Sequence, residues 1–217
     1  MPDFAVTERT RLHRCAHKVN YDKDLIYSIL DQIPQCTIAI CVDGQPRQMV
    51  SSHWRVGDDL YIHGGVSSAF YRQLAAGAAV SVSIAATDGL VLERSAYDTS
   101  VNFRSVMIYG RFAVVSQRAE QLALLQAFYQ HLLPGRWSEI RAPSVSEMAA
   151  TYVLRLPLVE VVAKLSQGGP QQPASGAEAS LWAGVRPYVQ AWGAVQADEA
   201  SASLPLPSSV AHLARTK

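Results

Sequence analysis

The chain has 217 residues, of which 49% are hydrophobic and 17% are charged, and its formal net charge is +1 at pH 7. This composition is sufficient for a hydrophobic core and is unlike that of a disordered chain. A charge so close to zero gives no general attraction for nucleic acid or an anionic membrane, and no apolar run approaches the roughly 20 residues of a membrane span. We therefore expect a soluble, cytoplasmic protein with no nucleic-acid partner, no membrane partner and no secretory signal.

The N-terminal half changes from helical to two-residue periodicity. Residues 1–20 are polar and basic, which favours an N-terminal arm. Apolar residues at helical spacing predict a helix from its cap Asp22 to Ile33. The alternation that follows predicts three strands joined by turns, at residues 36–42, 46–55 and 60–63.

The next part of the chain continues with short elements. Ser67 or Ser68 can cap a short helix that ends at Gly77. A capping box, Ser144-x-x-Glu147, begins another short helix. The remaining predicted elements are strands at 80–85, 105–115 and 151–164 and a helix at 118–133.

The composition changes near residue 165. Strands joined by hairpins, with helices inserted between them, favour a mainly β, antiparallel barrel domain over residues 21–165. Residues 166–193 are expected to be a linker and a docking segment, and residues 194–217, rich in Ala, Ser and Pro, a flexible tail. The docking segment is predicted to form an amphipathic helix with the apolar residues Trp182, Val185, Tyr188, Val189 and Trp192.

Polar stretches beside the strands are the candidate ligand-binding sequences, because no nucleophile, Walker or dinucleotide motif is present. Tyr61 to Ser68 is a strand that leads into small residues and a helix start, which suits a phosphate or is simply a tight turn. Arg94 and Arg104 are candidate anion clamps or surface arginines at strand ends. Trp137 is a candidate cover for an aromatic ligand or a core residue.

Metal ligands are not indicated. The three cysteines form no C-x-x-C pair, so we expect reduced thiols and no structural metal. His13 and His17 are at helical ligand spacing, but surface histidines are ordinary in a basic arm.

Six short motifs together resemble a known family. In chain order they are H-G-G…S-S, D-G-L-V-L-x-R-S-A, S-V-N-F-R-S-V-x-x-Y-G, P-G-R-W, R-x-P-S…E-M-A-A-T and A-K. Their order is similar to that of the flavin-nucleotide-binding family, in the superfamily of pyridoxamine 5′-phosphate oxidase and the nitroimidazole-resistance reductases. The resemblance runs from about Arg9 to about Trp182, and six ordered motifs are more specific than any single one.

This resemblance implies an antiparallel split β-barrel of the FMN-binding type, with FMN at a homodimer interface and redox chemistry carried by the flavin ring. The segment that resembles the strand along the flavin is Met49, Val50, Ser51 and Ser52. The turn that resembles the phosphate end contains His63, Gly64, Ser67 and Ser68. The later strand that resembles one approaching the cofactor carries Arg104 and Ser105.

The chain also departs from its relatives at charged positions. Ala69 stands where relatives show Arg, and Arg72, one helical turn later, is expected to take over that charge. Thr37 stands where relatives carry a His, and Asp98 with Thr99 stands where they carry a His pair. Ser166 stands where they carry an Arg. These replacements leave the chain with fewer charged and titratable groups than its relatives at these positions.

The leading functional prediction is an FMN-dependent oxidoreductase that transfers hydride or electrons to a small-molecule substrate, with His63 as the candidate proton-handling residue. An alternative is a non-catalytic protein that stores, senses or carries flavin, or has lost it. A third is a haem-binding split barrel with His13, His17 or His63 as axial ligand.

Overall fold

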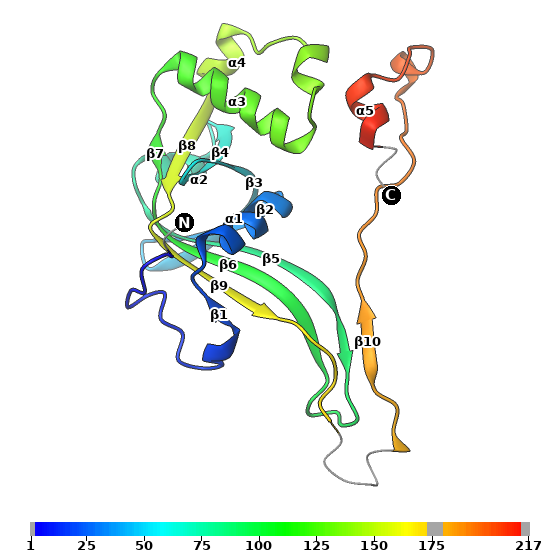
Figure 1. Ribbon diagram of the computed structural model, residues 1–217. Helices are drawn as coiled ribbons and strands as arrows, with labels where there is room; N and C mark the ends of the chain where they lie inside the picture. The colour runs from blue at the N-terminus through cyan, green and yellow to red at the C-terminus, as the bar shows by residue number, and fades with distance from the viewer. Residues whose placement is uncertain (1–2, 173–179, 214–217) are drawn as a thin grey trace.

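The computed structural model describes residues 3–172 and 180–213 of the chain. In this part, ten strands form one antiparallel sheet in the order β1-β9-β6-β5-β2-β3-β4-β8-β7, with β10 paired to β5. Within the described residues the end strands β1 and β7 do not pair with each other, so the sheet curls into a barrel that stays open (Figure 1). This arrangement confirms the predicted split barrel, mainly β with inserted helices.

The elements have the following bounds. The strands are β1 (Val19–Asn20), β2 (Gln35–Val42), β3 (Gln45–Val56), β4 (Asp59–Gly65), β5 (Ala79–Leu92), β6 (Ser100–Arg111), β7 (Ala113–Val114), β8 (Thr151–Pro157), β9 (Glu160–Ser166) and β10 (Gly184–Pro187). The α-helices are α1 (Lys23–Gln32), α2 (Ala69–Ala75), α3 (Arg118–Leu132), α4 (Val145–Ala149) and α5 (Ser208–Leu213). The 3₁₀ helices are η1 (Ala16–Lys18), η2 (Arg136–Glu139) and η4 (Glu199–Ser201).

Strand β3 connects the two halves of the barrel. Its first part pairs with β2, from Gln45 to Ser52, and its last four residues pair with β4, beginning at His53. The residues predicted to run along a flavin therefore lie just before the strand changes partner.

The main core lies between the sheet and helices α1 and α2. Asp22 caps α1 as predicted, since its side chain accepts a hydrogen bond from the Leu25 N–H at 2.6 Å. Helical spacing then turns Ile26, Ile29 and Leu30 towards the inward-facing side chains of β2, β5 and β6.

A second, smaller core lies under α3 and α4. It is centred on the fully buried Trp54 of β3 and Val153 of β8, and Leu124 and Leu125 pack on it from α3. Helices α3 and α4 lie together at one end of the molecule (Figure 1). In the described part of the chain, no helix is both long enough and apolar enough to cross a bilayer.

Three strand predictions need correction. The predicted strand at 105–115 is the end of β6, which already begins at Ser100, together with the separate strand β7. The predicted strand at 151–164 is two strands, β8 and β9, separated by a turn at Leu158 and Val159. Strand β5 extends to Leu92, well beyond the predicted 80–85, because its hairpin partner β6 and the short strand β10 both pair with its C-terminal part. The predicted pocket sequence that begins at Asp88 is therefore mostly strand.

The predicted amphipathic helix at 182–192 is wrong. Gly184–Pro187 instead forms β10 and pairs with β5, where Gly89 lets the backbone of Arg186 approach closely. Beyond it the chain is extended to residue 198 and ends in η4 and α5, where the buried Ser209 donates its N–H to Glu139 Oε1 at 3.0 Å. We call residues 188–207 the C-terminal strap. Residues 173–179 of the predicted linker, and 1–2 and 214–217 of the predicted arm and tail, lie outside the described residues.

Candidate functional site

A cavity of about 710 Å³ lies on the outer face of the sheet, between the strands and the C-terminal strap. We call it the sheet-face cavity. It is lined by side chains of β2, β3, β5 and β6, and by Tyr188 and Gln190 of the strap. Two of the predicted cofactor-binding residues, Val50 and Arg104, line it together.

The floor of the sheet-face cavity is flat and carries small side chains. Val50 of β3 lies opposite Thr37 of β2, and Thr37 lies opposite Ser83 of β5. Alternation along β5 adds Ala85 and Thr87 to the same face. Such a row leaves room for a planar group to lie against the strands.

The two residues that flank Val50 on β3, Met49 and Ser51, face inwards. Met49 packs against the main core, and the Ser51 hydroxyl lies 2.8 Å from the Tyr71 hydroxyl of α2. Ser52 pairs with Gln35 at the edge of the cavity. Strand β3 is therefore fixed from behind by α2 while Val50 stays exposed.

The predicted phosphate end is a compact turn between β4 and α2. The Tyr71 ring covers Gly64 so closely that a Cβ there would lie 2.3 Å from the ring. Ser68 caps α2, with its Oγ accepting the Tyr71 N–H at 3.5 Å. Arg72 Nη1 donates to the Ser67 carbonyl at 2.5 Å, so its guanidinium lies beside the turn.

Arg104 and Ser105 face in different directions. The Arg104 guanidinium forms an ion pair with Asp88 of β5, and its Nε is buried with no hydrogen-bond partner among the described residues. The Ser105 hydroxyl donates to the Lys164 carbonyl of β9 at 3.1 Å. Arg104 therefore offers a cation to the sheet-face cavity, whereas Ser105 ties two strands together.

His63 belongs to a different cavity. This aromatic cavity, about 370 Å³, lies under α3, η2 and α4. The His63 ring lies 5.8 Å from the Trp54 ring and 5.1 Å from the Phe128 ring, and Trp137 lines the same space. The structure therefore does not bring His63 together with Val50 and Arg104.

The His63 imidazole is held neutral by its surroundings. Burial lowers its pKa from the usual value for histidine. Its Nδ1 is buried, and no described residue gives it a hydrogen bond. The side chain therefore presents an unused nitrogen lone pair or N–H inside an apolar space.

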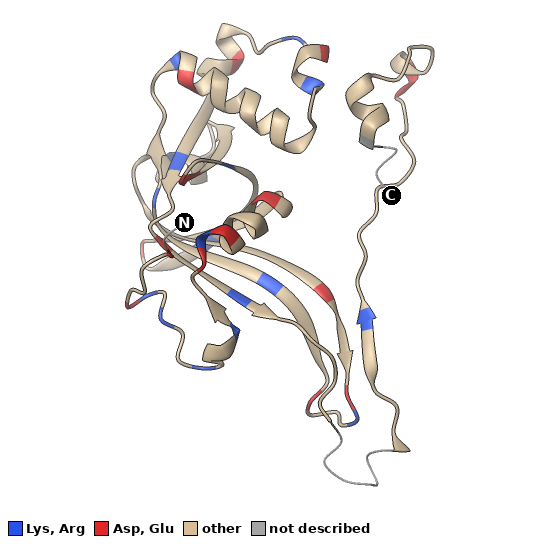
Figure 2. Ribbon diagram, in the orientation of Figure 1, with Lys and Arg blue, Asp and Glu red and all other residues tan. Residues whose placement is uncertain are grey.

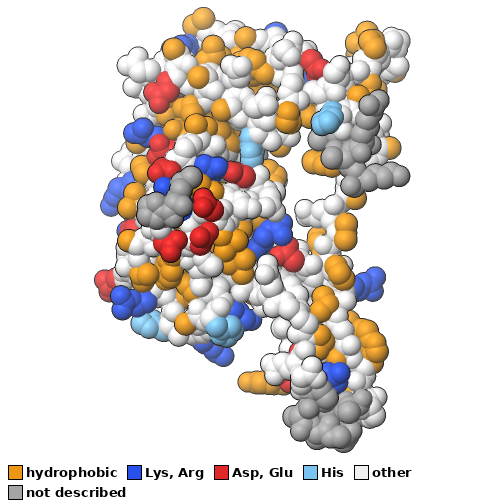
Figure 3. Space-filling model, in the orientation of Figure 1, with side chains coloured by type: hydrophobic (Ala, Val, Ile, Leu, Met, Phe, Trp, Pro, Cys, Tyr) orange, Lys and Arg blue, Asp and Glu red, His pale blue; other side chains and the backbone are white. Residues whose placement is uncertain are grey.

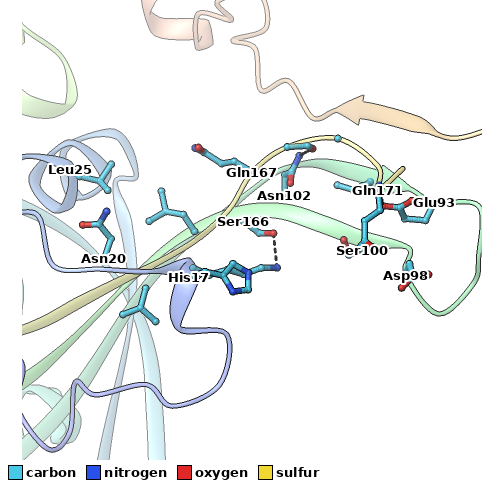
Figure 4. A pocket seen from close by; sticks show the side chains of 16 residues that line it. His17, Asn20, Leu25, Glu93, Asp98, Ser100, Asn102, Ser166, Gln167 and Gln171 are labelled. Carbon is cyan, nitrogen blue, oxygen red and sulfur yellow. Dashed lines mark hydrogen bonds between the residues drawn. The ribbon is translucent and has the colours of Figure 1, made fainter. Parts of the chain in front are cut away.

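A third cavity, of about 520 Å³, is polar (Figure 4). Here Lys18 Nζ donates to Ser166 Oγ at 2.9 Å, and Asn102 donates to the Gly168 carbonyl at 2.9 Å. Glu93 accepts the Gln171 N–H at 2.8 Å. Relatives carry an Arg at the position of Ser166, and in this chain the positive charge beside that position belongs to Lys18, from the N-terminal arm.

Sequence reasoning missed three residues that shape these sites: Lys18, Tyr71 and Tyr188. Lys18 is 148 positions away from Ser166, so no local pattern connects them. Tyr71 lies three residues after the helix cap Ser68, and this spacing predicts a helix. It does not predict that the Tyr71 ring packs on Gly64. Arg94, which the sequence singled out as a candidate anion clamp, donates its Nη1 hydrogen to the Gln171 carbonyl at 3.0 Å.

Comparison with known proteins gives consistent results. The FAD and haem binding protein from Mycobacterium smegmatis is 36% identical, with a TM-score of 0.85 over 90% of this chain and 97% of that chain. The flavocytochrome Anf3 from Azotobacter vinelandii is 29% identical, with a TM-score of 0.88 over 95% of this chain and 96% of that chain. A putative 5-nitroimidazole antibiotic resistance protein from Bacteroides thetaiotaomicron shares the fold at 21% identity, with a TM-score of 0.58 over 67% of this chain and 85% of that chain. No curated protein matches the sequence.

The family comparison covers the barrel itself. A model of the family described as pyridoxamine 5′-phosphate oxidase matches residues 22–165, which run from the cap of α1 to the end of β9. That span contains the sheet face, the turn before α2 and His63. The chain therefore belongs to the pyridoxamine 5′-phosphate oxidase family, as its six sequence motifs indicated.

Proposed function

We propose that the protein is a flavin-dependent oxidoreductase that transfers hydride or electrons to a small-molecule substrate. The observation that carries the proposal is the flat row of Val50, Thr37 and Ser83 across three strands, which offers a planar ring a surface free of bulky side chains. Arg104 lies on the same cavity and provides a cation for an anionic group. A bound flavin supplies the redox chemistry, so the chain has to supply binding, orientation and shielding from water.

The flavin that we propose is FAD. The sequence resemblance implied FMN, whereas the M. smegmatis protein, which is 36% identical over 90% of this chain, is described as binding FAD. That alignment extends well beyond the matched barrel, so it takes in much of the C-terminal part whose Tyr188 and Gln190 line the sheet-face cavity.

We also propose haem as a second cofactor, in the aromatic cavity. The His63 Nδ1 that no described residue satisfies is the supporting observation, because a neutral imidazole nitrogen facing an apolar cavity is the usual axial ligand of haem iron. Phe128 and Trp137 provide apolar walls. Arg141 on the same lining forms an ion pair with Glu147 and would have to exchange that partner for a haem carboxylate. Two of the similar structures are described as a haem-binding protein and a flavocytochrome.

The site residues have defined tasks in this proposal. Val50 and Thr37 support the flavin ring and Arg104 holds an anionic group. The turn before α2 offers the hydroxyl groups of Ser67 and Ser68. In the aromatic cavity, His63 would bind iron, which supplies one-electron chemistry.

The visible spectrum of the purified protein tests both parts. We expect flavin absorption together with a Soret band. Treating the heat-released flavin with phosphodiesterase should raise its fluorescence, because cleavage separates the adenine of FAD from the quenched ring, whereas FMN would not respond. Protein that takes up neither flavin nor haem would contradict the proposal, and a Soret band without flavin would leave only its haem part.

A further inference from the structure

The cavity of about 520 Å³, which we call the polar cavity, takes no part in the proposed flavin and haem sites. Its walls come from the N-terminal arm, from the tip of the β5–β6 hairpin and from the segment that follows β9. It shares no lining residue with the sheet-face cavity or the aromatic cavity. A molecule held here would therefore be separate from both proposed cofactors.

Opposite charges line the two ends of the polar cavity. His17 and Lys18 of the arm lie at one end, and Glu93 and Asp98 of the hairpin tip lie at the other, as the labelled residues in Figure 4 show. Figure 2 shows basic segments along the arm and acidic segments at the hairpin tip. In the space-filling view, basic and His side chains gather at the lower end of the body (Figure 3). The cavity is therefore positive at the arm and negative at the hairpin.

The charges of Lys18 and Glu93 are not neutralised by neighbours. Both residues are only partly exposed, and the ion pairs found among the described residues include neither of them. Lys18 Nζ donates to Ser166 Oγ at 2.9 Å, and its ammonium group has further donors for a ligand. Partly burying an unpaired charge is unfavourable, and a ligand that pairs with both charges removes that cost.

Hydrogen bonds hold the wall around Glu93 in place. Glu93 Oε1 accepts the Gln171 N–H at 2.8 Å, and Arg94 Nη1 donates to the Gln171 carbonyl at 3.0 Å. Asn102 Nδ2 donates to the Gly168 carbonyl at 2.9 Å. The segment after β9 is thereby fixed to the hairpin, so the acidic end is ordered before a ligand arrives. Such preorganisation lowers the entropy cost of binding.

The spacing of the strands sets the length of a ligand that reaches both ends. Ser166 of β9 pairs with Phe103 of β6, and β6 pairs in turn with β5, which ends just before Glu93. Two inter-strand spacings of about 4.8 Å, roughly 10 Å in total, therefore lie between the basic and the acidic end. The lining between them includes Ser100 and Leu165, which carry no charge. An uncharged chain suits this middle part.

We propose that the polar cavity binds an elongated zwitterion, a small molecule with a carboxylate at one end and a primary ammonium group at the other. The carboxylate binds Lys18, the ammonium group binds Glu93, and the chain between them lies over the uncharged lining. An ω-amino acid has this chemistry, whereas a simple anion uses only the basic end. The site is distinct from the proposed cofactor sites, and it does not rest on the proposed function.

Titration with 6-aminohexanoate, followed by the amide NMR spectrum of the protein, tests the proposal. We expect shifts at the Gln171 amide and at the side-chain amide of Asn102. Hexanoate and hexylamine, each of which lacks one of the two charges, should bind about tenfold or more weakly, because one charge-assisted contact is lost. Glycine should also bind weakly, since it is too short to reach both ends.

Matched variants assign each charge of the ligand to a residue. Lys18→Gln should remove the preference for 6-aminohexanoate over hexylamine, because neither ligand then finds a partner for a carboxylate. Glu93→Gln should remove the preference over hexanoate, and the new amide still has an acceptor for the Gln171 N–H. Arg14→Gln and Glu120→Gln change exposed charges outside the lining and should leave the affinity unchanged.

Several results would overturn the proposal. Equal affinities for 6-aminohexanoate and hexanoate would show an anion site only, and shifts that leave Gln171 and Asn102 unchanged would place the ligand elsewhere. The titration is run on protein with and without flavin. Binding that persists in flavin-loaded protein supports a separate site, whereas displacement of 6-aminohexanoate by flavin would overturn it. Protein that takes up no flavin but binds the zwitterion would contradict the flavin proposal and leave this one standing.

Discussion

Arg104 and Asp88 form an ion pair between neighbouring strands β6 and β5, at the edge of the sheet-face cavity. Both side chains are about one-third exposed or less. The carboxylate therefore competes with any anionic ligand for the guanidinium. An anionic ligand that binds at Arg104 therefore has to displace the Asp88 carboxylate or share the guanidinium with it.

Opposite changes in flavin affinity are expected from the two members of this pair. Arg104→Ala should weaken flavin binding about ten- to a hundred-fold, because a charge-assisted contact contributes roughly 1.5–3 kcal/mol. Asp88→Asn should strengthen binding, because the guanidinium is then free for the ligand. Flavin titration followed by fluorescence measures both, and equal affinities in the wild type and in Arg104→Ala would remove Arg104 from the site.

His63→Ala is expected to abolish the Soret band while leaving flavin absorption unchanged, because His63 lines the aromatic cavity and not the sheet-face cavity. His13→Ala and His17→Ala, in the N-terminal arm, should keep the Soret band. Haem titration followed by absorption makes the comparison. Loss of haem in the His17 variant but not in the His63 variant would move the axial ligand to the arm.

The turn between β4 and α2 should accept a methyl group at one glycine and reject it at the next. In Gly64→Ala the new Cβ would press on the Tyr71 ring, which costs about 1–3 kcal/mol of stability. In Gly65→Ala the nearest atom is the Ser67 hydroxyl at 3.6 Å, an ordinary contact. Urea unfolding of the two variants gives the difference, and equal midpoints would contradict the close packing of Tyr71 on Gly64.

His53 should make stability depend on pH. The side chain is fully buried in β3, its Nε2 donates to the Leu30 carbonyl at 3.2 Å, and burial lowers its pKa to about 4. The unfolded chain, with an ordinary pKa near 6.5, therefore binds a proton that the folded chain excludes between about pH 6.5 and pH 4. The contribution of His53 to the free energy of unfolding is fully present above this window. It falls as the pH drops, by about 2 kcal/mol between pH 7 and pH 5.

Urea midpoints at pH 7 and pH 5 measure this loss. The His53→Leu variant removes the titrating group, so its midpoint should change less between the two pH values than that of the wild type. A variant with the same pH dependence as the wild type would show that other groups control acid stability.

Local signals predicted the barrel well. Asp22 and the helical spacing after it gave α1 to within one residue, and the turn at Asp43-Gly44 has the positive φ angles, 51° and 73°, that such a hairpin requires. The capping box at Ser144 and Glu147 forms as predicted. Each of these features depends on residues a few positions apart, so neighbouring sequence was sufficient.

Features that depend on distant partners were not predictable in this way. Val185, Val189 and Trp192 have helical spacing, yet β10 forms there because β5 offers an edge about ninety positions earlier. The separation of His63 from Val50 likewise follows from the arrangement of α3 and α4 over one half of the barrel. For the candidate site, the sequence indicated which segments carry its residues. Only the three-dimensional fold shows which cavity each segment lines.

Tyr71 connects the turn before α2 to strand β3 through a single side chain. Its ring rests on Gly64 beside the turn, and its hydroxyl reaches Ser51 on the strand that carries Val50. The distance between the turn and Ser51 is thereby set by the length of one rigid phenol. Any displacement of the turn has to move β3 as well, so we expect the end of β4 and the middle of β3 to shift as one unit.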